Sequence, residues 1–220
     1  MILVPVKNLS TAKQRLAGVL DQPARTQLAQ AMLQDVLHAI AASQLRAECA
    51  LVTTDSFACE LARQHNFDVI PDLENPGETG AIEMATLVCV SRGIENTLVI
   101  PADIPLVLSS EIDQIAAQAP AEGSVLVPAA DGRGTNAAFR RPANLFPLRF
   151  GNDSFKPHLA AAQATGKPCK VVQLPGIGLD VDNPSDLQQL MAQPGESRAQ
   201  RLIRRWALSS NFLAAGTDCR

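Results

Sequence analysis

The sequence predicts a single α/β domain, built on a mostly parallel central sheet that is flanked by helices. The chain has 220 residues, of which 46% are apolar and 19% are charged. This length suits one domain, the apolar share is enough for a packed core, and the charge density is too low for a disordered chain. Short apolar runs alternate with helical patterns, which is typical of a sheet whose strands run mainly parallel.

The predicted strands are short runs of mainly aliphatic residues. They cover residues 2–6, 49–53, 67–70, 97–100, 124–127, 171–174 and 179–181. Helical patterns separate most of these runs, so the chain is expected to cross the sheet and return in the same direction.

The longest helix is predicted to begin at Pro23, a residue type favoured in the first turn. Leu33, Val36, Leu37 and Ile40 then fall on one apolar stripe. Four other helices are predicted. One follows Ser56, and another covers residues 82–90 and ends before Gly93. A third begins at a cap formed by Ser110 with Asp113 and runs toward Ala119, and a fourth begins at Asn183 and Pro184 and runs through Leu190.

The charge distribution argues against a nucleic-acid partner. The net charge is −3, from 19 Lys/Arg and 22 Asp/Glu. Residues 196–220 hold five of the basic and two of the acidic residues, which leaves 14 basic and 20 acidic residues in the body. Nucleic-acid binding rests on a basic face, so any phosphate must be met locally.

The sequence also indicates the compartment. No apolar run approaches the roughly 18 residues that span a bilayer, and no basic segment precedes a long apolar one. The five cysteines are odd in number and widely scattered, which favours neither a disulfide framework nor a thiolate metal site. We therefore expect no membrane partner and a cytoplasmic location.

A Pro/Gly-bearing linker at residues 193–196 divides the chain. It separates a predicted domain, residues 1–194, from a basic helical tail, residues 195–220. The tail is expected to be a solvated helix packed through Leu202, Ile203 and Trp206, although contact with a partner or an anionic surface is an alternative. The sequence allows a homodimer without requiring one.

The loop after the first strand carries three cations, Lys7, Lys13 and Arg15, and leads into a helix. Cations together with the N–H groups of a helix start suit a polyphosphate. A solvated first turn is the alternative, because Lys13 and Arg15 cannot share one helix face if both are already helical.

Carboxylates follow two other apolar runs. Asp103 stands between Pro101 and Pro105, in rigid backbone of the kind that suits a metal ligand. Asp180 and Asp182 are two residues apart and point the same way if the backbone is extended. Asp182 has a competing role as the cap of the next helix, whereas Asp180 has none. Three aspartates and phosphates favour Mg²⁺, and the sequence has no Cys/His cluster for zinc.

Two further segments suit a small anion. Gly134, Thr135 and Asn136 lie in a glycine-bearing loop that offers polar contacts, although a tight hairpin explains the glycines equally well. Downstream, Gly151 and Ser154 precede a helix and are expected to present N–H groups to an anion. Of the three histidines, only His158 lies near these segments.

Taken in order, these segments resemble the guanylyltransferases of coenzyme F420 biosynthesis, the CofC/FbiD family. The matching residues are Pro5-Val6-Lys7, 12–16, 102–106, Gly134-Thr135-Asn136, Phe150-Gly151 with Ser154 and His158, and 179–182. The resemblance spans roughly residues 2–190. It implies a single Rossmann-like nucleotidyltransferase domain that joins GMP from GTP to a phosphorylated three-carbon acid and releases pyrophosphate. The acid is 2-phospho-L-lactate, phosphoenolpyruvate or 3-phospho-D-glycerate, depending on lineage.

The resemblance also implies residue roles. Metal-binding carboxylates fall on Asp103, Asp180 and Asp182, and they would hold Mg²⁺. Contacts to the acid fall on Thr135, Gly151 and Ser154. The charge of the loop after the first strand, rather than the resemblance, places Lys7, Lys13 and Arg15 on the β and γ phosphates of GTP. Lys13, Arg15 and Asp103 then form the expected catalytic set.

One segment departs from the family pattern. Many members have Gly-Leu-Asn after the third strand, where this chain has residues 77–83. We expect this loop to touch the nucleotide, through Gly80, or the acceptor, and the altered loop favours 3-phosphoglycerate or phosphoenolpyruvate over 2-phospholactate. A different nucleotidyltransferase, or a metal-dependent glycosyltransferase of similar fold, is the alternative. A non-catalytic nucleotide-binding regulator would have no need of the carboxylates.

Overall fold

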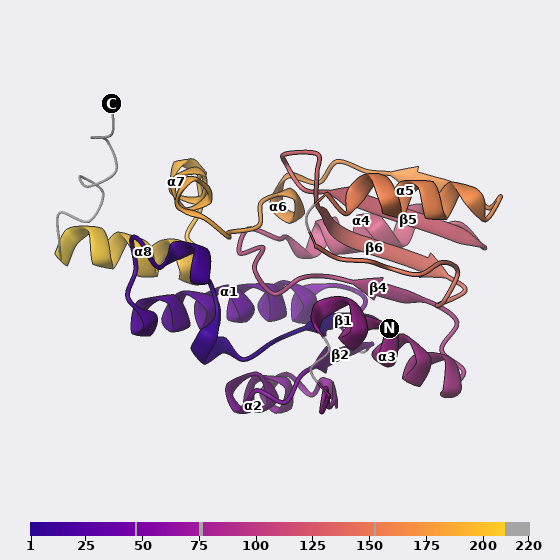
Figure 1. Ribbon diagram of the computed structural model, residues 1–220, viewed down its shortest axis with the longest axis horizontal. Coiled ribbons are helices and arrows are strands. Elements are labelled where there is room, and N and C mark those ends of the chain that lie inside the picture. Colours follow the sequence, from indigo (N-terminus) through magenta and orange to yellow (C-terminus); the bar gives the residue numbers. More distant parts are fainter. Residues whose placement is uncertain (47, 75–76, 152, 210–220) are drawn as a thin grey trace.

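The computed structural model describes residues 1–46, 48–74, 77–151 and 153–209 (Figure 1). Within them, seven strands form one sheet in the order β3-β2-β1-β4-β6-β5-β7. Neighbouring strands run parallel except where β6 pairs with β4 and β5, so the mostly parallel sheet is confirmed. The strands are β1 (Ile2–Pro5), β2 (Cys49–Val52), β3 (Asp68–Ile70), β4 (Thr97–Val99), β5 (Gly123–Pro128), β6 (Thr135–Arg141) and β7 (Cys169–Val171).

Helices cover both faces of this sheet. Ile2 and Val4 of β1 pack with α1, α2 and α4, whereas Leu3 packs with α3 and α5 on the other face. Burial on both faces explains why the strands read as unbroken apolar runs. The helices are α1 (Gln22–Ala42), α2 (Ser56–His65), α3 (Gly77–Ser91), α4 (Ser109–Gln118), α5 (Phe155–Ala164), α6 (Pro175–Gly178), α7 (Pro184–Ala192) and α8 (Arg198–Ser209), with short 3₁₀ turns η1 (Leu9–Thr11) and η2 (Gln14–Leu16).

Side-chain caps mark where α1 and α4 begin. Asp21 accepts the Ala24 N–H at 2.9 Å at the start of α1, which places Pro23 in the first turn, as predicted. The predicted cap of α4 by Ser110 is wrong. Instead, Glu111 accepts the Leu108 N–H at 3.0 Å, because a carboxylate in the first turn reaches back to the residue before the helix.

The strands in the second half of the sheet differ from the predicted ones. The sequence predicts no strand at β6, because Thr135–Arg141 lacks the aliphatic run that marks the others, yet β6 returns from β5 as a hairpin and pairs with β4. The predicted strand over residues 179–181 has no sheet pairing; the Val181 N–H donates to the Asp103 carbonyl at 3.1 Å. The last strand, β7, begins two residues and ends three residues earlier than the predicted run over residues 171–174.

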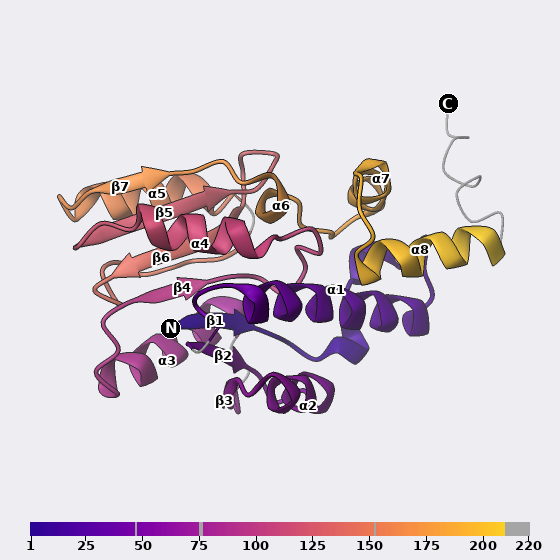
Figure 2. The same ribbon diagram turned by 180° about the vertical axis from the view of Figure 1, so that it is seen from behind.

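The helix α8 is docked on the body of the domain. Ala199 and Ile203 are buried in an apolar cluster with α1 and α7, and Leu202 and Trp206 pack against it, as predicted. Figures 1 and 2 show α8 beside one end of α1, at the same end of the molecule as α7. Residues 210–220 of the predicted tail lie outside the described residues. No helix of the described ranges is long and apolar enough to cross a membrane.

Asp35 of α1 caps α8 from a distance in the chain. Its carboxylate accepts the N–H groups of Arg198 at 2.9 Å and Ala199 at 3.0 Å, and the Arg198 guanidinium lies 3.5 Å from Asp35 Oδ1. Asp35 is buried, and this burial raises the pKa of its carboxyl although the hydrogen bonds act in the opposite direction. The cap therefore ties the start of α8 to the middle of α1.

We predict that Asp35→Ala lowers the free energy of unfolding by about 1–3 kcal/mol, because two N–H groups lose a charged acceptor. Urea unfolding followed by circular dichroism measures the change. Glu60→Ala is the matched control, since Glu60 is exposed on α2 and pairs with Arg63 at the surface. Equal stabilities of the two variants would contradict the role of Asp35.

Candidate functional site

The loop after β1 places two cations on one side of the site. Lys13 adopts a left-handed backbone conformation with φ of 56° between η1 and η2. This conformation is costly for a residue with a side chain. In an α-helix, Lys13 and Arg15 could not share one face. Because the backbone is not α-helical here, both side chains reach the carboxylate of Asp182.

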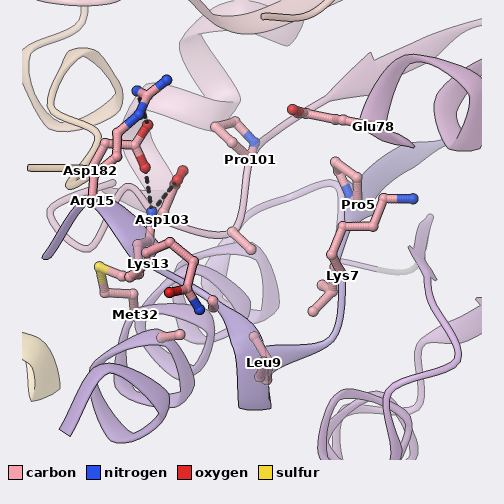
Figure 3. A pocket seen from close by; sticks show the side chains of 15 residues that line it. Pro5, Lys7, Leu9, Lys13, Arg15, Met32, Glu78, Pro101, Asp103 and Asp182 are labelled. Atoms are coloured by element: carbon pink, nitrogen blue, oxygen red, sulfur yellow. Dashed lines mark hydrogen bonds and ion pairs between the residues drawn. The ribbon is translucent and has the colours of Figure 1, made fainter. Parts of the chain in front are cut away.

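The ammonium of Lys13 bridges two carboxylates (Figure 3). Lys13 Nζ lies 2.6 Å from Asp103 Oδ2 and 2.8 Å from Asp182 Oδ1, and Arg15 Nη1 lies 3.4 Å from Asp182 Oδ2. Burial alone would lower the pKa of Lys13, but the two carboxylates outweigh it and hold the pKa well above its usual value. Burial likewise opposes ionisation of Asp182, yet Lys13 and Arg15 lower its pKa.

Asp182 does not cap the following helix. Asn183 is the cap of α7, and its side chain accepts the N–H groups of Ser185 at 2.9 Å and Asp186 at 3.2 Å. The Asp182 backbone N–H donates to the Asp186 carboxylate at 2.8 Å. The competing structural role for Asp182 is therefore wrong, and its carboxylate is directed to the cations.

Lys7 lies apart from Lys13 and Arg15. Its ammonium pairs with the buried carboxylate of Asp72 and points away from Lys13 (Figure 3). Lys7 still lines the same cavity as the other two cations. The three predicted cations thus share a cavity, but only two of them converge on one carboxylate.

Two cavities meet at the bridged carboxylates. One, of about 360 Å³, is lined by the loop after β1 and includes Lys7, Lys13 and Arg15. The other, of about 500 Å³, lies under the β5–β6 hairpin and the start of α5. Asp103 and Asp182 line both. A ligand in one cavity and a ligand in the other would therefore meet beside the same pair of charges.

Asp180 lines only the second cavity, and Lys13 pairs with Asp103 and Asp182 instead. Its Oδ1 accepts a hydrogen bond from Asn136 Nδ2 at 2.9 Å, and burial raises the pKa of its carboxyl. Across the described ranges, no three His, Cys, Asp or Glu side chains form a group that could by itself hold a metal ion. Asp103 and Asp182 share one cation, and Asp180 lies near enough for their charges to raise its pKa further.

The second cavity contains all three residues predicted to contact the acid, Thr135, Gly151 and Ser154. The glycines of the neighbouring loop do form a hairpin between β5 and β6, with Gly132 at φ of 71°, and that hairpin also lines the cavity. The hairpin and binding interpretations are therefore compatible.

His158 connects this cavity to the core, a role that the sequence did not indicate. The ring lies in α5 and is 1% exposed. Its Nδ1 is 2.9 Å from Thr135 Oγ1, and its Nε2 accepts the Arg149 N–H at 2.7 Å. The available sequence signal was its spacing of four residues from Ser154, one helical turn.

Glu78, rather than Gly80, lines the cavities. The segment predicted as a loop is the first part of α3, and Gly80 lies within that helix and outside both cavity linings. The Glu78 side chain points into the site (Figure 3). Loss of surrounding water, and then the charges of Asp103 and Asp182, raise the pKa of its carboxyl to about 7. Because Glu78 is exposed at the mouth of the site, water screens part of this effect.

The chain matches one known protein family over almost its whole length. The sequence model of the family described as guanylyl transferase CofC-like matches residues 1–218. The chain belongs to the CofC family. The match includes α8, so the expectation that the basic tail lies outside the family resemblance is wrong; the helix is part of the fold, packed on α1.

Curated relatives of this CofC family member carry two substrate names. The phosphoenolpyruvate guanylyltransferase of Roseiflexus castenholzii is 36% identical over 94% of this chain and 94% of its own length. The 3-phospho-D-glycerate guanylyltransferase of Colwellia psychrerythraea is 30% identical over 92% of this chain and 97% of its own length. Among the relatives, the family thus includes enzymes named for different acids.

Solved structures confirm the nucleotidyltransferase fold of the CofC family member. A protein from Desulfovibrio desulfuricans described as a nucleotide-diphospho-sugar transferase matches with a TM-score of 0.76 and 18% identity, over 94% of each chain. A CMP:2-keto-3-deoxy-manno-octonic acid synthetase matches with a TM-score of 0.58 and 14% identity, over 87% of this chain and 96% of that one. At these identities the likeness concerns the fold alone.

We predict a pH-dependent stability that originates in His158. Burial, with the charge of Arg140, lowers the pKa of its imidazole from 6.5 to about 4. A lowered pKa in the folded state stabilises the fold above pH 6.5, and this stabilisation is lost as the pH falls toward 4. Between pH 7.5 and pH 5 the loss attributable to His158 should be about 2 kcal/mol.

Urea unfolding of the parent and of His158→Gln at both pH values measures this effect. The variant lacks the titrating ring, so its stability should fall by about 2 kcal/mol less than that of the parent over the same interval. Equal losses in the two proteins would show that the ring is not held neutral in the folded state.

Proposed function

We propose that this protein transfers GMP from GTP to the phosphate of a small three-carbon phospho-acid and releases pyrophosphate, as a step of coenzyme F420 biosynthesis. The observation that carries the proposal is the bridge from Lys13 to Asp103 and Asp182, at the wall shared by the two cavities. Membership of the CofC family and relatives named as guanylyltransferases support it.

The first cavity suits the triphosphate of GTP. Lys13 and Arg15 place positive charge at its inner wall, and Lys7 adds a third cation at the far side. As pyrophosphate leaves, negative charge builds up on the β and γ phosphates, and fixed cations stabilise it without rearrangement. Lys13, which is largely buried, then exchanges part of its contact with the carboxylates for contact with phosphate.

The second cavity suits the acid. Thr135 and Ser154 supply hydroxyl groups, and Gly151, at φ of 133°, lets the backbone approach a ligand closely. The acceptor phosphate has its second pKa near 6, so at neutral pH it is mostly an anionic nucleophile and needs no side-chain base. The proposed transfer therefore requires no nucleophilic side chain activated by a base.

The donor set at the shared wall fits Mg²⁺. This ion is usually held by one or two carboxylates together with substrate phosphates and water. Asp103 and Asp182 already share one cation, Lys13, and Asp180 lies close by. These residues would hold Mg²⁺, which when bound neutralises phosphate charge. Since no three-ligand group is preformed among the described residues, substrate phosphates and water would supply the remaining ligands.

The choice of acid is decided by assay. Purified protein is incubated with GTP and Mg²⁺ and, in separate reactions, with phosphoenolpyruvate, 3-phospho-D-glycerate or 2-phospho-L-lactate; pyrophosphate release and product mass are measured. We expect one of the first two to react fastest, because the curated relatives carry both names. No release with any acid, but brisk release with a sugar phosphate, would favour a nucleotidyltransferase with a different acceptor.

We predict that Asp103→Asn lowers turnover by about 100-fold or more, because a carboxylate beside the transferred phosphate is lost. Turnover is measured by pyrophosphate release at saturating substrates, and circular dichroism checks the fold. Asp68→Asn, on the exposed edge strand β3, is the control and should retain parental turnover. Near-normal turnover of Asp103→Asn with Mg²⁺ binding unchanged would refute the assignment.

We predict that Lys13→Ala weakens GTP binding roughly 10-fold or more in the presence of Mg²⁺, whereas GMP binding changes little. The reason is that GMP lacks the β and γ phosphates that Lys13 is proposed to meet. Isothermal titration calorimetry measures both affinities, with Arg63→Ala on the exposed face of α2 as control. Equal losses for GMP and GTP would place Lys13 on the α phosphate or the acid instead.

A further inference from the structure

The hydrogen bonds around His158 define which ring nitrogen carries the proton. The backbone N–H of Arg149 donates to Nε2 at 2.7 Å, so Nε2 must be an unprotonated acceptor. In a neutral imidazole the single proton then lies on Nδ1. Nδ1 is 2.9 Å from Thr135 Oγ1, and its N–H therefore donates to the threonine hydroxyl.

This donation determines the role of the Thr135 hydroxyl. Its oxygen accepts from His158, so its own hydrogen is free to turn elsewhere. The hydroxyl of Ser154 is in a similar state, because its oxygen accepts the Thr135 backbone N–H at 3.1 Å. Among the described residues, neither hydroxyl hydrogen has an acceptor. Both side chains line the second cavity, and both are thereby prepared to donate to a ligand.

The same imidazole holds the backbone that leads to Gly151. Its Nε2 binds the N–H of Arg149, and the next N–H, that of Phe150, donates to Thr79 Oγ1 of α3 at 2.9 Å. The ring of Phe150 also meets the His158 ring edge-on, at 5.2 Å between centroids. One buried ring therefore contacts the strand residue Thr135 and the loop before Gly151 at the same time.

We infer that His158 is a positioning residue for the acid: it orients the Thr135 hydroxyl as a hydrogen-bond donor toward an anionic oxygen of the substrate. The inference rests on the proposed function for the identity of that substrate. Among the described residues, these two hydroxyl groups donate to no protein acceptor, so they can donate to a ligand. They therefore favour a ligand with a carboxylate or phosphate oxygen, which accepts hydrogen bonds, over a ligand whose group at that place is a donor. His158 contacts no reacting atom and acts through Thr135.

Two substitutions separate this role from a purely structural one. The side-chain amide of Asn overlaps the Nδ1 end of imidazole, so His158→Asn can keep the donation to Thr135. The amide of Gln reaches the Nε2 end, so His158→Gln can keep the bond to Arg149 while losing Thr135. We expect His158→Gln to raise the KM for the acid about 10-fold and His158→Asn to raise it clearly less.

The coupling between the two residues provides a second readout. Thr135→Val should raise the acid KM by a similar factor, and Thr135→Val combined with His158→Gln should raise it no further, because both changes remove one interaction. GTP affinity, measured by calorimetry, should stay at the parental value throughout. His38→Phe, exposed on α1, is the control and should match the parent in both measurements.

Several outcomes would overturn the inference. They are equal effects of His158→Asn and His158→Gln, effects of Thr135 and His158 substitutions that multiply, or a loss of GTP affinity equal to the loss of acid affinity. The ¹⁵N spectrum of the imidazole tests it without substrate: a protonated Nδ1 is expected, and a protonated Nε2 contradicts it. A parent protein that releases no pyrophosphate with any acid refutes the proposed function instead, and the ¹⁵N spectrum then decides the hydroxyl assignment alone.

Discussion

The ammonium of Lys13 lies between Asp103 and Asp182, which are 90 and 169 residues further along the chain, and so joins three distant segments. Two carboxylates brought this close repel each other unless a cation lies between them, and here the cation comes from the chain itself. The left-handed backbone at Lys13 is the local cost of this arrangement. As a result, the loop after β1, the loop after β4 and the segment before α7 are held in one fixed geometry at the edge of the sheet.

The two cavities follow from the direction of the strands on either side of that bridge. The parallel strands β1 and β4 end at it, so the loops that follow them form the first cavity. The antiparallel strand β6 instead begins there, and it brings Thr135 and Asn136 to the same edge of the sheet. A single reversed strand therefore places a second cavity beside the first, and the two cavities give room for two ligands.

The second cavity depends on a buried polar network more than on charge. Thr135, Ser154 and His158 are all almost fully buried, and each is bonded to another of the three or to the backbone. Buried polar groups are costly when unpaired, so such a network is stable in one arrangement and stiffens the pocket it borders. The bonded imidazole stays neutral, since burial and the Arg140 charge both disfavour a second proton.

The sequence by itself determined the features that depend on neighbouring residues. Strands buried on both faces read as apolar runs, and the start of α1 followed from Pro23. The cations and aspartates after the strands marked the edge of the sheet where the two cavities lie. Only the tertiary structure decided which cation meets which carboxylate, that Asn183 rather than Asp182 caps α7, that Glu78 lies in a helix, and that β6 runs antiparallel. The reason is physical: a cap or an apolar stripe is set within a few residues, whereas an ion pair, a strand direction or a histidine tautomer is set by groups that only the folded chain brings together.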